Sequence, residues 1–172
     1  MINRILFMIM WSLTKRSKRA DIIRKQGVEI GSGCEIYRDV YFGSEPYLIK
    51  IGNNVRLTSG VKFCTHDGGI WTLRKMKLAE NADIFGKIEI GNNVHIGWNT
   101  IIMPNVKIGN NCIIGCGAVV TKNIPDNSIA VGVPAKIIKT VDEYCNCNNE
   151  KMVFTANLSG IEKQKAVLEK MR

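Results

Sequence analysis

The chain has 172 residues and a formal net charge of +9, from 24 basic against 15 acidic residues. Its length suits one domain with its own core, and no apolar run approaches the roughly 20 residues that a membrane-spanning helix needs. The N-terminus lacks the usual design of a signal peptide, so we expect a cytoplasmic protein. A positive charge suits a nucleic acid or a phosphorylated small molecule equally well. Because the basic residues are scattered and show no aromatic–basic motif, we expect no nucleic-acid partner.

Residues 1–29 are predicted to form a helical cap. Residues 5–11 are apolar and precede a basic cluster. We interpret them as a helix that packs on the end of the domain, with a peripheral membrane contact as the less favoured alternative. Ser17 is the expected N-cap of a short helix over 21–26, and Gly27 is its expected terminator.

Six Ile-Gly steps on a six-residue grid follow the cap, and from Ile90 to Val120 an apolar residue recurs at every sixth position. Such a unit is too short to bury its apolar residue alone, so successive units must stack. Gly and Asn fill the corners, where both tolerate left-handed backbone. A second small or apolar residue stands four places after each repeat start: Val55, Val61, Val94, Thr100, Val106, Cys112 and Ala118. These features predict an all-β fold, a triangular parallel β-helix over 30–139.

Laid out in coils, the repeats predict three faces, which begin at Ile30, Ile51, Ile90 and Ile108, at Ile36, Leu57, Ile96 and Ile114, and at Phe42, Phe63, Ile102 and Val120. A small bulge falls near 43–50, and an excursion of about 21 residues leaves the coil over 67–87. A loop of that length is often a lid or a binding loop. Residues 140–172 are expected to form a partly helical extension, with a capping box at Ser159–Glu162 before the last helix.

The cysteines are expected to be free. Cys34 and Cys112 fall where small buried residues belong, which favours reduced thiols in the cytosol. Cys145 and Cys147 have no partner pair at zinc-finger spacing, so we expect no metal site.

The hexads, the stretch 86–106 and the segment VVTKNIPDNSIAVGVPAKIIK at 119–139 resemble the hexapeptide-repeat acyltransferases. Within that family the chain is most similar to acetyl-CoA-dependent sugar O-acetyltransferases of the galactoside, maltose and capsular-polysaccharide type. The resemblance implies a left-handed coil, acetyl-CoA as acyl donor and a homotrimer with the donor in the groove between subunits.

His66 is the candidate catalytic residue. It ends the third face at the mouth of the excursion, beside Gly68 and Gly69, and a neutral imidazole is a suitable general base near pH 7. The resemblance agrees, because the family's catalytic histidine stands at the start of this excursion. The alternative is a turn histidine that bonds to backbone.

Three further residues are candidates for contact with the acceptor substrate. Asp67 follows His66, although adjacent side chains in extended backbone point apart and Asp67 equally suits a turn before the glycines. Trp71, on the excursion, could stack on a sugar ring, unless this segment clasps a neighbouring subunit. His95 is expected between Arg56 and Ile113 of adjacent coils; related enzymes often have tryptophan there, and the alternative is an exposed or interface histidine.

The resemblance also assigns positions to the donor. Glycines would let the pantetheine amides approach the strand backbone, and lysines would oppose the phosphates. Trp98 and Cys116 depart from the family, which commonly has smaller residues there. The expected donor-binding residues are Gly97, Trp98, Gly115, Cys116, Gly117, Thr121, Lys122, Lys136 and Lys139.

Together with these residues, the resemblance implies an acetyl-CoA-dependent O-acetyltransferase that modifies a hydroxyl of a sugar or polysaccharide precursor. An amino-sugar N-acetyltransferase is one alternative, because a sugar amine also needs deprotonation. A non-catalytic solenoid for binding or assembly is another. A carbonic anhydrase on the same scaffold needs three histidines around zinc, and this chain has two.

Overall fold

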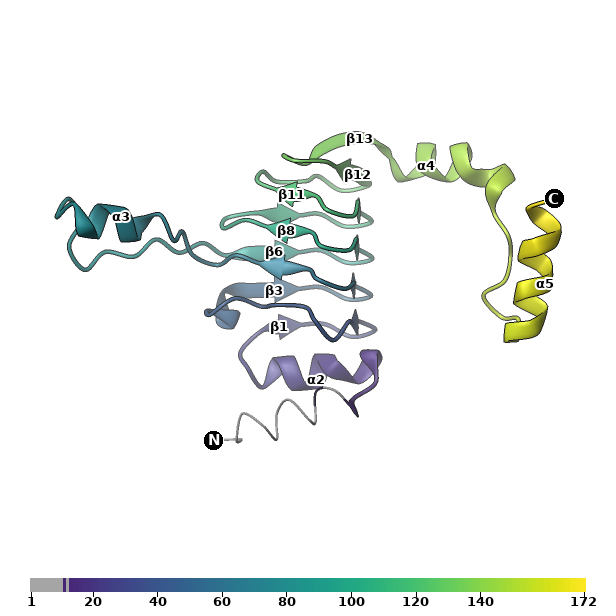
Figure 1. The fold of residues 1–172 in the computed structure, drawn as a ribbon, viewed down its shortest axis with the longest axis horizontal. Helices are drawn as coiled ribbons and strands as arrows, with labels where there is room; N and C mark the ends of the chain where they lie inside the picture. The colour runs from purple at the N-terminus through teal and green to yellow at the C-terminus, as the bar shows by residue number, and fades with distance from the viewer. Residues whose placement is uncertain (1–10, 12) are drawn as a thin grey trace. The chain divides into compact units, whose positions relative to one another are not determined.

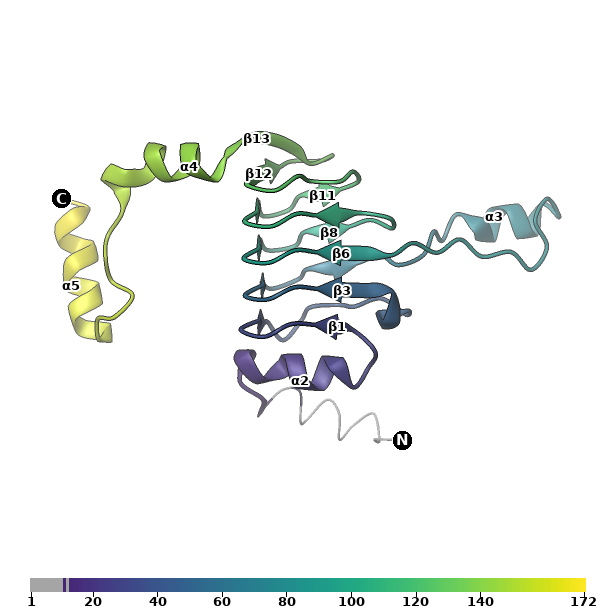
Figure 2. The same cartoon turned by 180° about the vertical axis from the view of Figure 1, so that it is seen from behind.

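The computed structural model describes residues 11 and 13–172. Contacts divide the chain into two units, 1–141 and 142–172, which are described separately. The first unit is a stack of coils, each built from very short strands joined by corners (Figures 1 and 2). None of the helices in the described part of the chain is long and apolar enough to cross a bilayer.

Three sheets run along the coil, and the strands within each pair in parallel except for the final hairpin of β12 and β13. The first sheet contains β1 (Glu29–Ile30), β3 (Ile49–Ile51), β6 (Ile88–Ile90) and β9 (Lys107–Ile108). The second contains β2 (Glu35–Ile36), β4 (Arg56–Leu57), β7 (His95–Ile96), β10 (Ile113–Ile114), β12 (Ser128–Val131) and β13 (Lys136–Thr140). The third contains β5 (Lys62–Phe63), β8 (Ile101–Ile102) and β11 (Val119–Val120).

The three predicted faces are confirmed by the strand register. Ile30 pairs with Ile51, Ile51 with Ile90, and Ile90 with Ile108 in the first sheet. The other two sheets repeat this pattern, and the predicted bulge contains the short 3-10 helix η2 (Pro46–Leu48). The left-handed sense of the coil stays a prediction from the resemblance.

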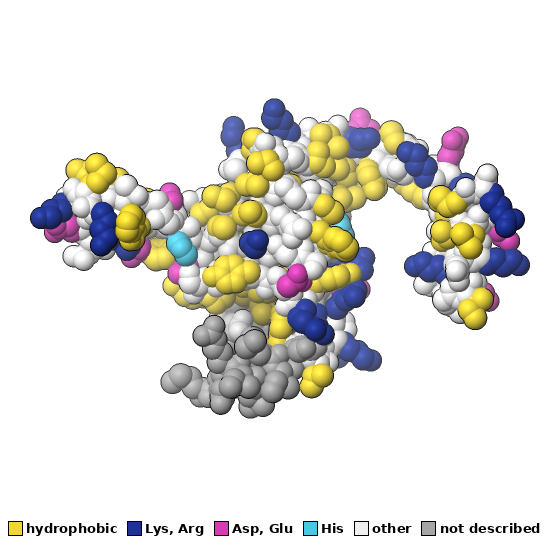
Figure 3. Space-filling model, in the orientation of Figure 1, with side chains coloured by type: hydrophobic (Ala, Val, Ile, Leu, Met, Phe, Trp, Pro, Cys, Tyr) yellow, Lys and Arg dark blue, Asp and Glu magenta, His cyan; other side chains and the backbone are white. Residues whose placement is uncertain are grey.

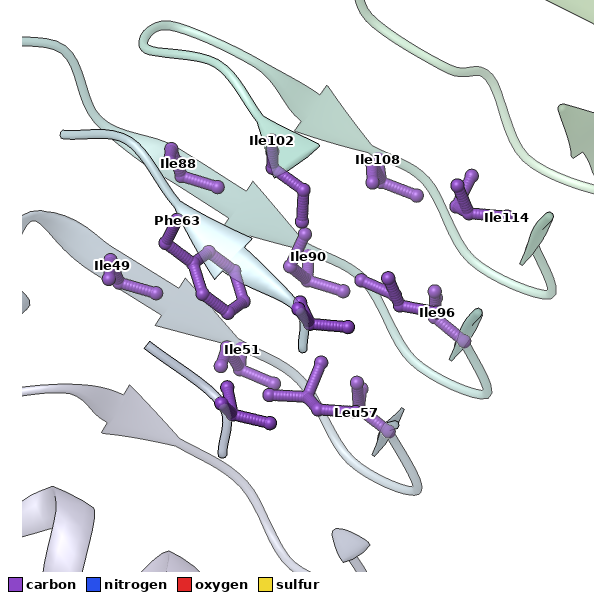
Figure 4. Close-up of a cluster of buried hydrophobic side chains, with 14 of the residues drawn as sticks. Ile49, Ile51, Leu57, Phe63, Ile88, Ile90, Ile96, Ile102, Ile108 and Ile114 are labelled. Carbon is purple, nitrogen blue, oxygen red and sulfur yellow. The ribbon is translucent and has the colours of Figure 1, made fainter. Parts of the chain in front are cut away.

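The core is a column of apolar side chains that point inward from all three sheets (Figure 4). The apolar residue at each repeat start, most often isoleucine, stacks on its equivalent in the next coil, and the rings of Phe42 and Phe63 stack with centroids 5.4 Å apart. The seven predicted small positions, from Val55 to Ala118, are all buried. Each hexad therefore contributes two inward residues, as the period indicates.

Asparagines close the corners that follow the first sheet. Asn54, Asn93 and Asn111 adopt left-handed backbone with φ of 56°, 55° and 53°. Their side-chain amides form a ladder, with Asn54 Nδ2 donating to Asn93 Oδ1 at 3.1 Å and Asn93 Nδ2 to Asn111 Oδ1 at 3.0 Å. Asparagine thus serves twice at these corners, once for its backbone conformation and once for its amide.

The N-terminal cap differs from its prediction. In the described part of the cap, the 3-10 turn η1 (Arg16–Lys18) leads into the helix α2 (Arg19–Arg24), which begins and ends two residues before the predicted bounds. Ser17 as N-cap is wrong: it lies inside the 3-10 turn, and the residue before α2 makes no side-chain cap. Gly27, with φ of 103°, follows the end of the helix as expected. The prediction for 5–11 falls outside the described residues except at Trp11, whose indole donates to the Arg38 carbonyl.

The second unit contains α4 (Val141–Asn148, whose first residue belongs to the first unit), η3 (Asn149–Lys151) and α5 (Gly160–Lys170). The predicted capping box is confirmed. Ser159 Oγ accepts from the Glu162 amide, and Glu162 Oε2 accepts from the Ser159 amide at 2.9 Å. This exchange satisfies two of the amides that a helix start leaves unpaired.

Glycine at position 91 is required by the stacking of coils. A Cβ there would lie 2.7 Å from the carbonyl carbon and oxygen of Gly109 and 2.8 Å from the amide nitrogen of Asn110. These are backbone atoms, so the clash would force a shift of the next coil. We expect Gly91→Ala to lower the free energy of unfolding by about 1–3 kcal/mol in chemical denaturation. Gly68→Ala, with no atom within 4 Å, is the matched control. Equal stability of the two variants would contradict this explanation.

Candidate functional site

The excursion is an arm that projects from the stack of coils (Figure 1). It leaves the third sheet after Thr65, includes α3 (Ile70–Lys75) and returns beside its own start. The two ends are held together by backbone hydrogen bonds, from the Asp67 amide to the Ile84 carbonyl and from the Gly86 amide to the Thr65 carbonyl, both 2.9 Å. His66 lies between these bonds and is therefore fixed at the base of the arm.

A carboxylate holds the His66 ring. Glu45 Oε2 lies 3.1 Å from His66 Nδ1, and the Ser44 hydroxyl lies 3.2 Å from the same nitrogen. The Glu45 side chain is 15% exposed whereas that of His66 is 47% exposed. The carboxylate is thus shielded behind a ring that faces solvent.

Glu45 is held in its ionised form. The Thr65 hydroxyl, from a fully buried side chain, donates to Glu45 Oε2 at 2.6 Å. This bond is the main reason that the pKa of Glu45 lies below its usual range, with smaller contributions from His66 and Ser44. A carboxylate at Nδ1 favours the tautomer with the proton on that nitrogen, which leaves Nε2 as a proton acceptor.

Sequence reasoning missed Glu45, although the register contains a signal for it. His66 follows Glu45 by 21 residues, the same spacing that separates Phe63 from Phe42 and Ile51 from Ile30. Glu45 therefore stands one coil from His66 at the equivalent position. Applying the 21-residue spacing to polar residues as well as apolar ones would have paired Glu45 with His66.

The structure separates the other acceptor candidates from this pair. Asp67 Oδ1 accepts from the Gly69 amide at 2.8 Å, which is the turn that we considered as an alternative. Trp71 lies on α3, out on the arm, where the residue is 61% exposed and Lys75 Nζ lies 5.6 Å from its ring centroid. An acceptor role for either residue stays a prediction.

His95 lies where the register places it, in β7 between Arg56 and Ile113. Burial lowers its pKa, and the charge of Arg56 lowers it further, so the ring is neutral at neutral pH. It belongs to the second sheet, whereas His66 follows a strand of the third. The two histidines are thus not brought together within this chain. In the described part of the chain, no group of three or more His, Cys, Asp and Glu side chains is placed to hold a metal ion.

Five of the predicted donor residues form one column at the corner after the second sheet. The Gly117 amide donates to the Trp98 carbonyl at 2.6 Å, and both Trp98 and Cys116 are exposed. A Cβ on Gly97 would lie 2.6 Å from the Cys116 amide nitrogen, so stacking alone requires glycine there. A pantetheine contact at Gly97 or Gly115 stays a prediction.

The remaining donor candidates lie at the last coil. Thr121 and Lys122 are exposed and follow β11, while Lys136 begins β13. The Ala135 amide donates to the Val119 carbonyl at 2.8 Å, which brings the start of β13 to β11. Lys139 pairs with Ile129 further along the hairpin. The four residues thus share one end of the stack, with their basic groups at its surface.

Comparison with known proteins places this geometry in a family. Residues 87–122 match the family model described as bacterial transferase hexapeptide, six repeats. The structure of a maltose O-acetyltransferase from Clostridium difficile 630 is similar, with a TM-score of 0.61 and 30% identity over 78% of this chain and 82% of that one. Protein CapG of Staphylococcus aureus is 52% identical over 163 residues, which cover 93% of each chain. The chain belongs to the hexapeptide-repeat acyltransferases.

A further similar structure, a galactoside acetyltransferase in complex with coenzyme A, has a TM-score of 0.57 and 26% identity over 88% of this chain and 82% of that one. The family and enzyme class expected from the hexads and the 119–139 segment are therefore confirmed.

The depressed pKa of Glu45 predicts an acid-dependent stability. A carboxyl whose pKa is lower in the folded state stabilises the fold above its unfolded pKa, about 4.3, and this contribution is lost as pH falls through the folded pKa. We expect the free energy of unfolding to fall less between pH 5 and acid pH, on the order of 3, in Glu45→Gln than in the wild type. Denaturant melts across that range measure it. Parallel curves for the two proteins would show that Glu45 is not stabilised in its ionised form.

Proposed function

We propose that the protein is an acetyl-CoA-dependent O-acetyltransferase that acts on a hydroxyl of a sugar or polysaccharide precursor. The observation that carries the proposal is the pair Glu45–His66 at the base of the arm, in a chain of the hexapeptide-repeat acyltransferase family. The named activities of its relatives support a sugar as acceptor.

In the proposed reaction, His66 Nε2 removes the proton from the acceptor hydroxyl. The oxygen attacks the thioester carbonyl carbon, and the tetrahedral intermediate collapses with loss of the coenzyme A thiolate. The imidazolium returns the proton to that sulfur, so the products are an acetyl ester and free thiol. Glu45 holds Nδ1–H and opposes the positive charge on the ring while it exists.

We assign the donor to the column at 97–98 and 115–117 and to the last coil, where Thr121, Lys122, Lys136 and Lys139 would face the phosphates. A relative solved with coenzyme A supports this donor. The groove between subunits of a homotrimer would complete the site. A cytoplasmic location suits the six free cysteines, two of them buried.

The product shows whether the acetyl group is transferred to oxygen or to nitrogen. Incubation with acetyl-CoA and a panel of sugars, amino sugars and nucleotide sugars, followed by mass spectrometry, distinguishes an ester from an amide. An ester labile to mild base supports the proposal, whereas a base-stable amide supports the N-acetyltransferase. Binding of coenzyme A without transfer to any of them would favour a non-catalytic solenoid.

Replacing His66 tests the base. We expect His66→Ala to lower kcat by about 10²–10⁴, because no general base then takes the proton from the substrate hydroxyl. Coenzyme A binding, measured by calorimetry, should stay within about twofold, since His66 is not among the residues assigned to the donor. Full activity in the variant would show that His66 is not the general base. Loss of coenzyme A binding would mean that the variant disturbs the fold.

Replacing Glu45 tests the positioning of the ring. We expect Glu45→Gln to lower kcat by about 10²-fold or more with little change in KM, because the amide no longer selects the Nδ1–H tautomer. Glu29→Gln, an exposed carboxylate of the same solenoid, is the matched control and should leave kcat and KM unchanged. A rise in KM together with lower thermal stability, in place of a fall in kcat alone, would indicate only a structural role.

A further inference from the structure

A basic pocket lies at the N-terminal end of the second sheet, apart from the pair at His66. It has a volume of about 570 Å³ and is lined by the segment around η1 and by side chains of the first coils. Lysine and arginine side chains gather over the lower coils near α2 (Figure 3). The charged residues of the lining are Lys15, Arg16, Arg19, Arg38, Arg56 and Glu35.

The charges of this pocket do not cancel. Among the lining residues that the structure describes, five cations face one carboxylate, a formal excess of four. Glu35 is already engaged, with its Oε2 3.1 Å from Arg56 Nε. Arg19, which is 5% exposed, donates to the carbonyl oxygens of Ile36 at 2.8 Å and Trp11 at 3.3 Å. A nearly buried guanidinium is therefore held by neutral groups among other cations.

The pKa of Arg19 is affected both by burial and by the neighbouring cations. Burial lowers its pKa, and the neighbouring charges of Arg38 and Arg16 lower it further. Like charges beside a buried guanidinium cost free energy, which a bound anion would recover.

One tyrosine holds two of the guanidinium groups in place. Arg16 donates to the Tyr37 hydroxyl at 2.7 Å with its guanidinium carbon 4.0 Å from the ring centroid. Arg56 approaches the same hydroxyl at 3.4 Å and the same ring at 5.9 Å. Fixing these long side chains in advance reduces the entropy that a ligand would otherwise have to remove. The cluster is thus ordered in the way that a binding site requires.

We propose that this pocket binds a soluble phosphate-bearing small molecule, with the charge of a diphosphate, at a site separate from acetyl transfer. Planar guanidinium forks match phosphate oxygens, and an excess of four charges suits a polyanion better than a single carboxylate. The volume exceeds what a diphosphate fills and leaves room for the group attached to it. The pocket shares no residue with the His66 pair or the donor column, so it is a second site and stands whether or not the proposed acetyl transfer is correct.

Calorimetric titration of the full chain with inorganic pyrophosphate and with uridine diphosphate, at about 150 mM salt to screen loose surface attraction, tests this site. We expect saturable binding, weakened at least about tenfold (1.4 kcal/mol) in the double variant Lys15→Gln/Arg16→Gln. The control, Lys62→Gln/Lys163→Gln, removes the same charge from exposed lysines elsewhere and should stay within about twofold. Thermal melts of both variants check that the fold is intact.

Three outcomes would overturn the proposal. One is the absence of saturable binding to the wild type. Another is equal weakening in both double variants, which would indicate attraction to net charge alone. The last is binding to vesicles of phosphatidylcholine with phosphatidylglycerol but to neither soluble anion, which would indicate a basic membrane-contacting surface. Binding of pyrophosphate as tightly as uridine diphosphate would place the recognition in the phosphates and supports the proposal.

Discussion

The structure depends on the mutual support of adjacent coils. Most strands of the three sheets are only two residues long, so none could persist without the equivalent strand beside it. The inward isoleucines are buried because adjacent coils place their own apolar side chains against them, as Ile96 and Ile114 do for each other. Backbone pairing and burial of the core are therefore the same event, repeated along the stack.

That dependence also determines the candidate site. The register aligns polar residues of adjacent coils in the same way as apolar ones. Glu45 therefore lies next to His66, although the two are 21 residues apart in the sequence. Thr65, buried in the same coil as His66, then fixes the charge of that carboxylate. The arm can leave the stack at this point because its two ends bond to each other, so that the coil closes beneath it.

The sequence predicted what periodicity controls. The three faces, the inward small residues and the origin of the arm were all found, because a fixed period leaves one register that buries the apolar residue at every repeat start. Glu45 was missed because the period was applied only to apolar residues. Ser17 was assigned wrongly because an N-cap depends on the backbone conformation of a single residue, and a 3-10 turn there removes the extended conformation that a cap needs.

The surface of a regular solenoid offers little chemistry of its own, and both proposed polar sites lie where its regularity ends. Within the stack, backbone amides and carbonyls form hydrogen bonds with the neighbouring coils. At the corners, the asparagine side chains form hydrogen bonds with one another. At the base of the arm the coil is interrupted, and a histidine and a carboxylate meet. At the N-terminal cap the stack stops, and arginines are gathered around Tyr37 over the first coils. The two places have opposite electrostatic character, an ionised carboxylate behind a solvent-facing ring and a cluster of cations with one engaged carboxylate. A scaffold built from similar units can therefore carry two polar sites that share no residue, one at an interruption of the coil and one at its end.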